Sequence, residues 1–272
     1  MNKYLLLGDK LSHSKSPEIH KIILDKFNDD ATYEKCECSI NDLNKLIDDG
    51  KKGIYKGFNV TIPYKIEIMK YLDIIDDKAL KIGSINTVKF ISGKAIGYNT
   101  DYDGFKKALE FYNIDAENKN AYILGTGGAS KAINSVLKDL NAKTYLVSRD
   151  KNKGDLSYLD LKNKDIDILV NTTPVGMYPD IDKSPLDLNI INKAKVVVDI
   201  IFNPLKTKLL KLANSEYNGL YMLIYQAIKA EEIWHNKTYD DVSYLYEIIK
   251  NNREAGFGGQ NRYAALEGTA LK

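Results

Sequence analysis

Two side chains in the first half of the chain could move a proton during a reaction. Lys65 stands just after a short apolar segment that Pro63 ends, and Asp101 closes an Asn-Thr-Asp run. A charged lysine can give a proton to an alkoxide as a ketone is reduced, and recover it in the reverse reaction. Asp101 would orient the ammonium group and the reacting hydroxyl. The pair suits alcohol–ketone interconversion, and the plain alternative for Lys65 is a solvated surface lysine.

Hydroxyl and amide side chains accompany this pair. Ser14 and Ser16 precede a helix that begins near Pro17, where paired hydroxyls and the helix dipole could hold a carboxylate. Ser16 is also a good N-cap, so capping is the alternative. The period of two along a strand places Asn59 and Thr61 on one face. A pocket that suits a small polyhydroxylated acid is predicted from Ser14, Ser16, Asn59, Thr61, Lys65, Asn86, Thr100 and Asp101.

A glycine-rich turn at residues 125–128 joins an apolar strand to a helix, and a second strand follows at 143–147. This order is the setting of a dinucleotide-binding turn. Gly125 permits the tight turn, and Gly127 lets a pyrophosphate approach the N–H groups and the positive dipole at the helix start. Ser130 stands where the usual pattern has its third glycine, so a plain connecting turn is the alternative.

Arg149 indicates which dinucleotide such a turn would bind. It follows Ser148 at the end of the second strand, and it is the only arginine before residue 253. An acidic residue at this place typically binds the ribose 2′-hydroxyl of NAD, whereas arginine accommodates the 2′-phosphate of NADP. Asp150 comes next, so a shift of one residue would favour NAD. With Lys151 and Lys153 nearby, we interpret this segment as an NADP pocket.

The composition argues against several other classes of protein. The 272 residues carry 39 basic and 37 acidic side chains, which gives no bulk field for nucleic acid or a membrane surface. No apolar run approaches the about 18 residues of a membrane span, and no signal peptide is evident. Cys36 and Cys38 are expected to be buried free thiols on one strand face, and the three histidines are scattered, so no metal site is expected. We expect a reduced, cytoplasmic protein.

Two α/β modules in series would position these groups. Apolar patterns predict strands at 3–8, 32–38, 57–62, 86–91, 94–98, 121–124, 143–147, 166–170 and 196–201, with Ser92-Gly93 as a hairpin turn. Helices are predicted at 17–27, 40–47, 66–72, 102–112, 222–234 and 239–250. The composition changes after residue 252. Residues 253–272 are interpreted as a poorly ordered tail or a cloning remnant.

Together these motifs resemble the shikimate dehydrogenase family, from Leu6 to about Trp234. The segments that carry the resemblance are Ser14 to Pro17, Asn59 to Lys65, Asn86, Asp101, Gly125 to Ala129, Ser148-Arg149 with Lys153, Asn171 to Met177, Asp199 to Pro204, and Gln226-Ala227. The resemblance implies reversible, NADPH-dependent reduction of 3-dehydroshikimate to shikimate, a step of chorismate and aromatic amino-acid biosynthesis. It also implies an N-terminal α/β substrate domain, residues 1–101, and a Rossmann-type NADP-binding domain, residues 102–221. Helices at about 222–252 would pack back on the first domain.

The resemblance also implies roles for single residues. Lys65 and Asp101 would be the catalytic pair. The substrate would contact Ser14, Ser16, Asn59, Thr61, Lys65, Asn86, Asp101, Phe202 and Gln226. NADP would contact Asp77, Gly125, Thr126, Gly127, Gly128, Ala129, Ser148, Arg149, Lys153, Thr172, Ile200 and Gly219.

The chain departs from the family pattern at two positions. Phe202 replaces a tyrosine that usually touches the substrate, and Tyr221 replaces a small glycine and could crowd the nicotinamide. We expect altered affinity rather than lost activity. Two alternatives stay open: a dehydrogenase for quinate or another cyclic hydroxy acid that uses NAD, and a non-catalytic nucleotide-binding paralogue. A monomer or a homodimer is expected, with no nucleic-acid or membrane partner.

Overall fold

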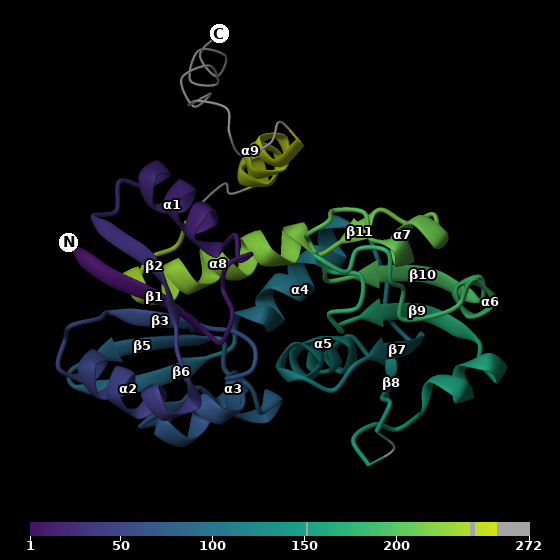
Figure 1. The fold of residues 1–272 in the computed structure, drawn as a ribbon, viewed down its shortest axis with the longest axis horizontal. Helices are drawn as coiled ribbons and strands as arrows, with labels where there is room; N and C mark the ends of the chain where they lie inside the picture. The colour runs from purple at the N-terminus through teal and green to yellow at the C-terminus, as the bar shows by residue number, and fades with distance from the viewer. Residues whose placement is uncertain (151, 240–242, 255–272) are drawn as a thin grey trace, which may run out of the picture. The chain divides into compact units, whose positions relative to one another are not determined.

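A computed structural model describes residues 1–150, 152–239 and 243–254 (Figure 1). Residues 1–238 form one unit, and a second unit begins at Tyr239. The second unit contributes one described helix, α9 (Ser243–Glu254), where the sequence predicts a helix at 239–250. The interpretation of 253–272 as a tail falls, from residue 255 onward, outside the described residues.

The first sheet has six strands in the order β2-β1-β3-β5-β6-β4. They are β1 (Asn2–Gly8), β2 (Ala31–Glu37), β3 (Gly57–Val60), β4 (Ile74–Ile75), β5 (Thr87–Ile91) and β6 (Lys94–Tyr98). β1 pairs in parallel with β2 and β3, whereas β3, β5 and β6 pair antiparallel. Ser92 and Gly93 have positive φ angles, as a tight hairpin turn requires, so the predicted hairpin is confirmed.

Helical segments of the first half lie between these strands. They are α1 (Ser16–Lys26), the 3₁₀ turn η1 (Ile40–Asp42), α2 (Leu43–Lys51), the 3₁₀ helix η2 (Glu67–Tyr71) and α3 (Asp77–Ile82). β4 and α3 were not predicted, because they are too short for an apolar period to show. The Asp76 side chain caps α3, and Gly83 ends it at a φ of 70°.

Two predictions for this half are wrong in detail. The strand predicted at 57–62 ends at Val60. Thr61 N–H still donates to Leu7, but Pro63 has no N–H with which to continue the ladder. Cys36 and Cys38 are half-buried free thiols rather than buried ones. Both thiols pack against the apolar core of the first sheet. Because β2 is an edge strand, the outer side of this segment stays uncovered.

The second sheet has five parallel strands in the order β11-β10-β9-β7-β8. They are β7 (Asn120–Leu124), β8 (Lys143–Val147), β9 (Ile166–Asn171), β10 (Ala194–Asp199) and β11 (Tyr217–Asn218). Helix α5 (Gly128–Asp139) joins β7 to β8, and shorter helical turns follow: η3 (Tyr158–Asn163), α6 (Leu188–Ile191) and α7 (Lys208–Leu212). The strand order reverses between β7 and β9, which is where doubly wound α/β sheets bind ligands.

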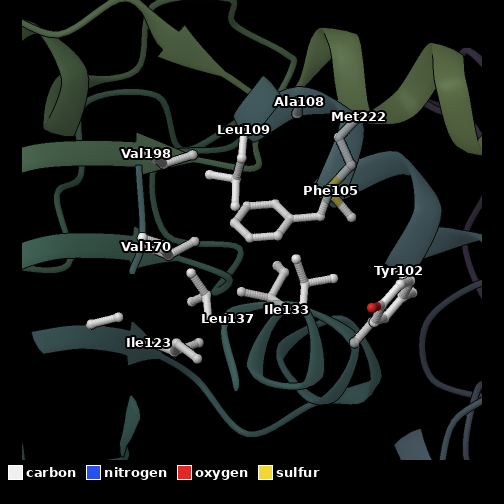
Figure 2. Close-up of a cluster of buried hydrophobic side chains, with 14 of the residues drawn as sticks. Tyr102, Phe105, Ala108, Leu109, Ile123, Ile133, Leu137, Val170, Val198 and Met222 are labelled. Atoms are coloured by element: carbon white, nitrogen blue, oxygen red, sulfur yellow. The ribbon is translucent and has the colours of Figure 1, made fainter. Parts of the chain in front are cut away.

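Two long helices, α4 (Thr100–Phe111) and α8 (Leu220–His235), connect the sheets (Figure 1). Phe105 and Leu109 of α4 and Met222 of α8 pack with α5 against β7, β9 and β10 (Figure 2). At the other end of α8, the Trp234 indole donates to Val88 O on the first sheet, at 2.9 Å. The predicted α/β class, with a Rossmann-like second half and α8 packed back on the first sheet, is confirmed.

Candidate active site

Lys65 and Asp101 meet where the first sheet faces the glycine turn. Lys65 lies in the loop after β3, and Asp101 lies in the first turn of α4. The Nζ atom of Lys65 is 2.6 Å from Oδ2 of Asp101, and the side chains are only 14% and 7% exposed. A charge-assisted hydrogen bond between such poorly hydrated groups holds the ammonium in a fixed place.

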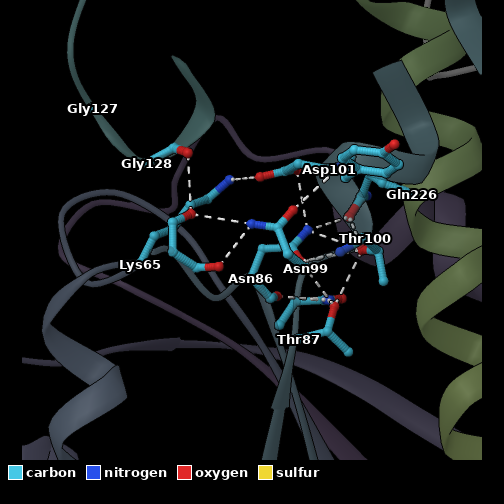
Figure 3. A network of polar contacts seen from close by, with 12 residues as sticks. Lys65, Asn86, Thr87, Asn99, Thr100, Asp101, Gly127, Gly128 and Gln226 are labelled. Atoms are coloured by element: carbon cyan, nitrogen blue, oxygen red, sulfur yellow. Dashed lines mark hydrogen bonds and ion pairs between the residues drawn. The ribbon is translucent and has the colours of Figure 1, made fainter. Parts of the chain in front are cut away.

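Asn86 holds the other oxygen of the Asp101 carboxylate. Its Nδ2 donates to Oδ1 of Asp101 at 3.1 Å and to Oγ1 of Thr100 at 2.9 Å, and its Oδ1 accepts from the Thr100 N–H (Figure 3). Gln226 of α8 also joins this network, because its Oε1 accepts from Asn86 at 3.3 Å. Both carboxylate oxygens are therefore engaged, so Asp101 has one orientation available to it.

Ser84 connects this network directly to the glycine turn. Asn99 caps α4 and donates from Nδ2 to the Ser84 hydroxyl at 3.1 Å. The Ser84 hydroxyl in turn donates to Gly128 O at 3.0 Å. The start of α5 is thereby fixed against the loop that carries Lys65.

The glycine turn has the geometry that a bound phosphate needs. Gly125 has a φ of 109°, which a residue with a side chain rarely adopts, and it lies beside Thr172 at the end of β9. Helix α5 starts at Gly128 with no side-chain cap, so its first N–H groups are available to an anion. The turn follows β7, at the point where the strand order reverses between β7 and β9 and a dinucleotide would bind.

Two departures from the usual glycine pattern have a structural reason. The Ser130 hydroxyl donates to Gly127 O at 2.7 Å, so the serine in the third glycine position braces the turn. A Cβ on Gly128 would lie 2.8 Å from Cβ of Lys65, closer than such atoms normally approach. The additional glycine makes room for the lysine.

Arg149 follows the end of β8 and is exposed. Its neighbour Asp150 accepts a hydrogen bond from Asn152 N–H at 3.0 Å and lies 3.5 Å from Nζ of Lys153. Asp150 is thus satisfied within its own loop, as is the adjacent hydroxyl of Ser148, which accepts from Asp150 N–H. The structure places Arg149 at the strand end and Lys153 beside Asp150 in the same loop.

Ser14 and Ser16 lie close together, with their hydroxyl oxygens 3.4 Å apart. The N-cap of α1 is Lys15 and makes no side-chain cap bond, so the interpretation of Ser16 as the N-cap is wrong. The Tyr33 hydroxyl donates to Oδ1 of Asn59, another predicted substrate residue, at 2.8 Å. Tyr33 was not predicted as part of the site, since a tyrosine in an alternating strand gives no local sign of such a contact.

Asn59 lies beneath the site. It is 5% exposed, and its Nδ2 donates to Asn86 O and to the Thr87 hydroxyl, both at 3.1 Å. Both ends of its amide are therefore used within the protein. Thr61, one residue beyond the strand end, is half-buried.

The remaining predicted residues lie on both halves of the molecule. The Thr172 hydroxyl donates to Leu124 O at 2.6 Å. Gly219 lies directly against the backbone of Ile200, Phe202 is half-buried after β10, and Asp77 is exposed in the first turn of α3. Thr126 and Ala129 belong to the turn itself and are half-buried.

Tyr221, one of the two departures from the family pattern, packs against α4. The ring of Tyr221 stacks on Phe111 of α4, with centroids 4.1 Å apart and an interplanar angle of 14°. This stack places the ring on α4 and gives it a packing role there.

Asp199 is a further buried group, and it is not among the predicted substrate or cofactor residues. It accepts from Asn171 Nδ2 at 3.1 Å, from the Thr207 hydroxyl at 2.7 Å and from Ile201 N–H at 3.1 Å. Burial raises the pKa of Asp199 to about 6, although these hydrogen bonds act in the opposite direction. Asp199 joins the loop after β9 to the loop after β10, both at the carboxyl ends of the parallel strands.

Fold and site together define an oxidoreductase of the dinucleotide-dependent α/β class. Residues 6–88 match the family model for the shikimate dehydrogenase substrate binding domain. A curated relative, the NADP(+) shikimate dehydrogenase of Clostridium beijerinckii, is 42% identical over 268 residues, which cover 92% of this chain and 99% of the relative. The chain belongs to the shikimate dehydrogenase family.

Solved structures agree with this assignment. Shikimate dehydrogenase 1 from Peptoclostridium difficile is 42% identical and superimposes with a TM-score of 0.86, covering 95% of this chain and 100% of that one. Shikimate 5-dehydrogenase from Thermus thermophilus, in complex with NADP(H) and shikimate, is 27% identical with a TM-score of 0.82, covering 92% and 99%.

Two features are absent from the described residues. Among them, no helix combines the length and apolar character that crossing a bilayer requires. The same ranges contain no group of three or more histidine, cysteine or acidic side chains arranged to hold a metal ion.

Proposed function

We propose that this chain is an NADP-dependent shikimate dehydrogenase that reversibly reduces 3-dehydroshikimate to shikimate. The observation that carries the proposal is the Lys65–Asp101 pair, 2.6 Å apart and packed against the glycine turn at Gly128. A proton donor and a dinucleotide-binding turn are thereby adjacent, as carbonyl reduction requires. The names of the relatives, NADP(+) shikimate dehydrogenases, support the substrate and the cofactor.

Lys65 acts as the general acid in the reduction. NADPH, when bound, supplies the hydride. The Lys65 ammonium gives one of its protons to the carbonyl oxygen as that oxygen becomes a hydroxyl, and the oxidation reverses this transfer. Asp101 holds the ammonium through Oδ2, while Asn86 holds Oδ1, so the proton donor keeps its direction.

The substrate carboxylate would bind at Ser14 and Ser16, whose hydroxyls are not used to cap α1. The ring hydroxyls would lie near Lys65, Asp101 and the network of Asn86 and Gln226. Contacts from Thr61 and Phe202 would complete the substrate site, with Asn59 supporting it from below.

The cofactor phosphates would bind at the start of α5, from Gly125 to Ala129. Thr172, Ile200, Gly219 and Asp77 would flank the rest of the cofactor. Arg149 favours NADP, because it is exposed at the end of β8 while the acidic alternative, Asp150, is occupied by Asn152 and Lys153. Ser148 and Lys153 would assist at the 2′-phosphate.

The organisation of the protein is part of the same proposal. The substrate domain would comprise residues 1–101 with the helices from 222 to 252, and the NADP domain residues 102–221. The small-molecule substrate needs no macromolecular partner, and the protein would act in the cytoplasm as a monomer or a homodimer.

A paired absorbance assay at about 340 nm, where reduced nicotinamide absorbs, tests the proposal. Shikimate and quinate are each offered with NADP⁺ and with NAD⁺. The proposal predicts the highest kcat/KM for shikimate with NADP⁺. Faster turnover with NAD⁺ would contradict the role of Arg149, faster turnover of quinate would contradict the substrate, and cofactor binding without turnover would indicate a non-catalytic paralogue.

A further inference from the structure

Asp199 and Asn171 end two neighbouring parallel strands, and their side chains meet there. Asp199 is the last residue of β10, Asn171 is the last residue of β9, and the two are register partners. Both are 0% exposed. Nδ2 of Asn171 donates to Oδ1 of Asp199 at 3.1 Å, and the Ile200 N–H donates to Asn171 O at 3.1 Å. The carboxyl ends of β9 and β10 are therefore joined by side chains as well as by the ladder.

Three uncharged donors hold the Asp199 carboxylate. Besides Asn171, the Ile201 N–H donates to Oδ1 at 3.1 Å, and the Thr207 hydroxyl donates to Oδ2 at 2.7 Å. Burial raises the pKa of Asp199 to about 6, so above that pH the group is a buried anion that only accepts hydrogen bonds. Removing this acceptor would leave buried donors without a partner, which is costly. The loops after both strands therefore depend on one carboxylate.

On the β9 side, Asn171 extends the network into the following loop. Its Oδ1 accepts from the Thr173 N–H at 3.0 Å and from the Thr173 hydroxyl at 2.7 Å. Thr172 lies between these two residues, and its hydroxyl donates to Leu124 O at the end of β7, next to the glycine turn. Through Asn171, Asp199 thus fixes a loop that contains a predicted cofactor residue.

On the β10 side, the backbone that Asp199 binds supports two more predicted cofactor residues. Ile200 lies between Asp199 and Ile201, whose N–H donates to the carboxylate. Ile201 O accepts from the Gly219 N–H at 3.1 Å, and a Cβ on Gly219 would collide with Ile200 O. Gly219 is therefore held directly against the segment that Asp199 fixes.

These predicted cofactor residues lie on the opposite side of the glycine turn from Arg149. In the sheet order β11-β10-β9-β7-β8, Arg149 follows β8 on one side of β7. On the other side, the ends of β9, β10 and β11 are followed by Thr172, Ile200 and Gly219. A dinucleotide with its phosphates at the turn after β7 lies across the carboxyl ends of the strands. With its adenosine end toward Arg149, its nicotinamide end would lie at the residues that Asp199 supports.

We propose that Asp199 is a positioning residue for the nicotinamide end of the cofactor: it fixes the loops after β9 and β10 at the spacing that this end requires. The inference rests on the proposed function, since it takes the glycine turn to bind NADP. Asp199 is fully buried and acts through the backbone next to it, at Thr172 and Ile200. The adenosine end of the cofactor should not depend on it.

The first test compares the binding of two ligands by isothermal titration calorimetry. NADP⁺ spans the whole proposed cofactor site, whereas adenosine 2′,5′-bisphosphate fills only the end near Arg149. Asp199→Ala should raise Kd for NADP⁺ about 5- to 20-fold and leave Kd for adenosine 2′,5′-bisphosphate within about twofold. Asp199→Asn keeps an acceptor oxygen for Asn171 and Ile201, so it should keep Kd for NADP⁺ within about threefold of the wild-type value.

Ser215→Ala is the matched control for a loss of stability. Ser215 is also buried, and its hydroxyl donates at 2.7 Å to Val197 O, two residues before Asp199 in the same strand. This variant should lower Tm and change neither dissociation constant. If Asp199→Ala weakens both ligands equally, or leaves NADP⁺ binding unchanged, the inference is overturned.

Asn171→Ala tests the same contact and decides the matter if Asp199→Ala does not fold. It removes the donor to Oδ1 of Asp199 and the acceptor for Thr173, and it leaves the bonds from Ile201 and Thr207 in place. Kd for NADP⁺ should rise about fivefold, with adenosine 2′,5′-bisphosphate unaffected. Because the two residues act through one contact, the double variant should bind NADP⁺ little more weakly than Asp199→Ala alone. An unchanged Kd for NADP⁺ in Asn171→Ala would contradict the proposed positioning.

The wild-type protein separates the two proposals. If it does not bind NADP⁺, the proposed cofactor site fails, and this inference fails with it before any variant is compared. If the wild type binds NADP⁺ and oxidises shikimate, and Asp199→Ala keeps both dissociation constants, only the inference about Asp199 is overturned.

Discussion

Lys65 lies so close to Gly128 that an added Cβ at the glycine would be 2.8 Å from Cβ and 3.1 Å from Cδ of the lysine. The lysine belongs to the first half of the chain and the glycine to the dinucleotide turn of the second. This contact, together with the Ser84–Gly128 hydrogen bond, brings Lys65 to the turn. The close approach of Lys65 is therefore a structural reason for glycine at position 128.

Gly128→Ala should lower kcat about 10- to 100-fold, because displacing a catalytic group by about 1 Å can cost that much. The substitution suits the helix itself, so the free energy of unfolding should change little. Steady-state kinetics and thermal unfolding check both expectations. Lys138→Ala, in the last turn of the same helix, is the matched control. An unchanged kcat in Gly128→Ala would show that Lys65 does not depend on this contact.

Arg149→Ala should weaken NADP⁺ selectively. Losing a charge-assisted contact with the 2′-phosphate predicts an increase in KM for NADP⁺ of about 10- to 100-fold. KM for NAD⁺ should change by less than about twofold, since NAD⁺ has no such phosphate. Lys153→Ala should have a smaller effect, because Lys153 pairs with Asp150. Equal effects of Arg149→Ala on both cofactors would contradict this assignment.

Asp199 should make stability depend on pH. Its pKa is raised from 3.8 to about 6 in the folded protein, so the folded state binds this proton more tightly than the unfolded chain does. The free energy of unfolding should therefore fall as the pH rises from 4 to 7, by up to about 3 kcal/mol from this group.

Asp199→Asn supplies the reference for that measurement, because it removes the titration and keeps the side-chain shape. Urea unfolding of both proteins is followed between pH 4 and pH 7. The difference between their free energies of unfolding should change with pH in favour of the variant at pH 7. A difference that is constant over this range would contradict the raised pKa.

Cys36 should react with iodoacetamide near neutral pH. A hydrogen bond from Cys38 lowers the pKa of the Cys36 thiol to about 7, against the opposing effect of burial. The same hydrogen bond and burial raise the pKa of Cys38, so Cys38 should stay inert. Cys38→Ala removes the donor and should move the midpoint of the alkylation rate toward that of an ordinary thiol. The same midpoint in both proteins would exclude this hydrogen bond.

The sequence predicts what depends on local pattern. The hairpin turn at Ser92-Gly93 and the strand–turn–helix start at Gly125 follow from residue types that tolerate those backbone angles. Motif and position predict Lys65 and Asp101 as a pair. In the structure their hydrogen bond joins residues that are 36 positions apart. Local pattern does not predict α3 and β4. Their six and two residues are too few for an apolar period to appear.

The sequence does not predict contacts that depend on how the elements assemble. The contact of His20 with Glu231 spans 211 residues, and neither residue type indicates the other. Cys36 and Cys38 were expected to be buried, but their exposure depends on β2 being an edge strand, which the order of the sheet decides. The need for glycine at 128 likewise becomes visible only when Lys65 is in place.

The most direct test of the central claim is the rate of shikimate oxidation by Lys65→Ala with NADP⁺, measured beside shikimate affinity. The control is Lys70→Ala, which removes a lysine that is 68% exposed and paired with Glu67. Loss of the general acid–base group predicts a fall in kcat of about 10²- to 10⁴-fold, with the dissociation constant for shikimate changed by less than about threefold. A large loss of affinity with an unchanged kcat would contradict the account.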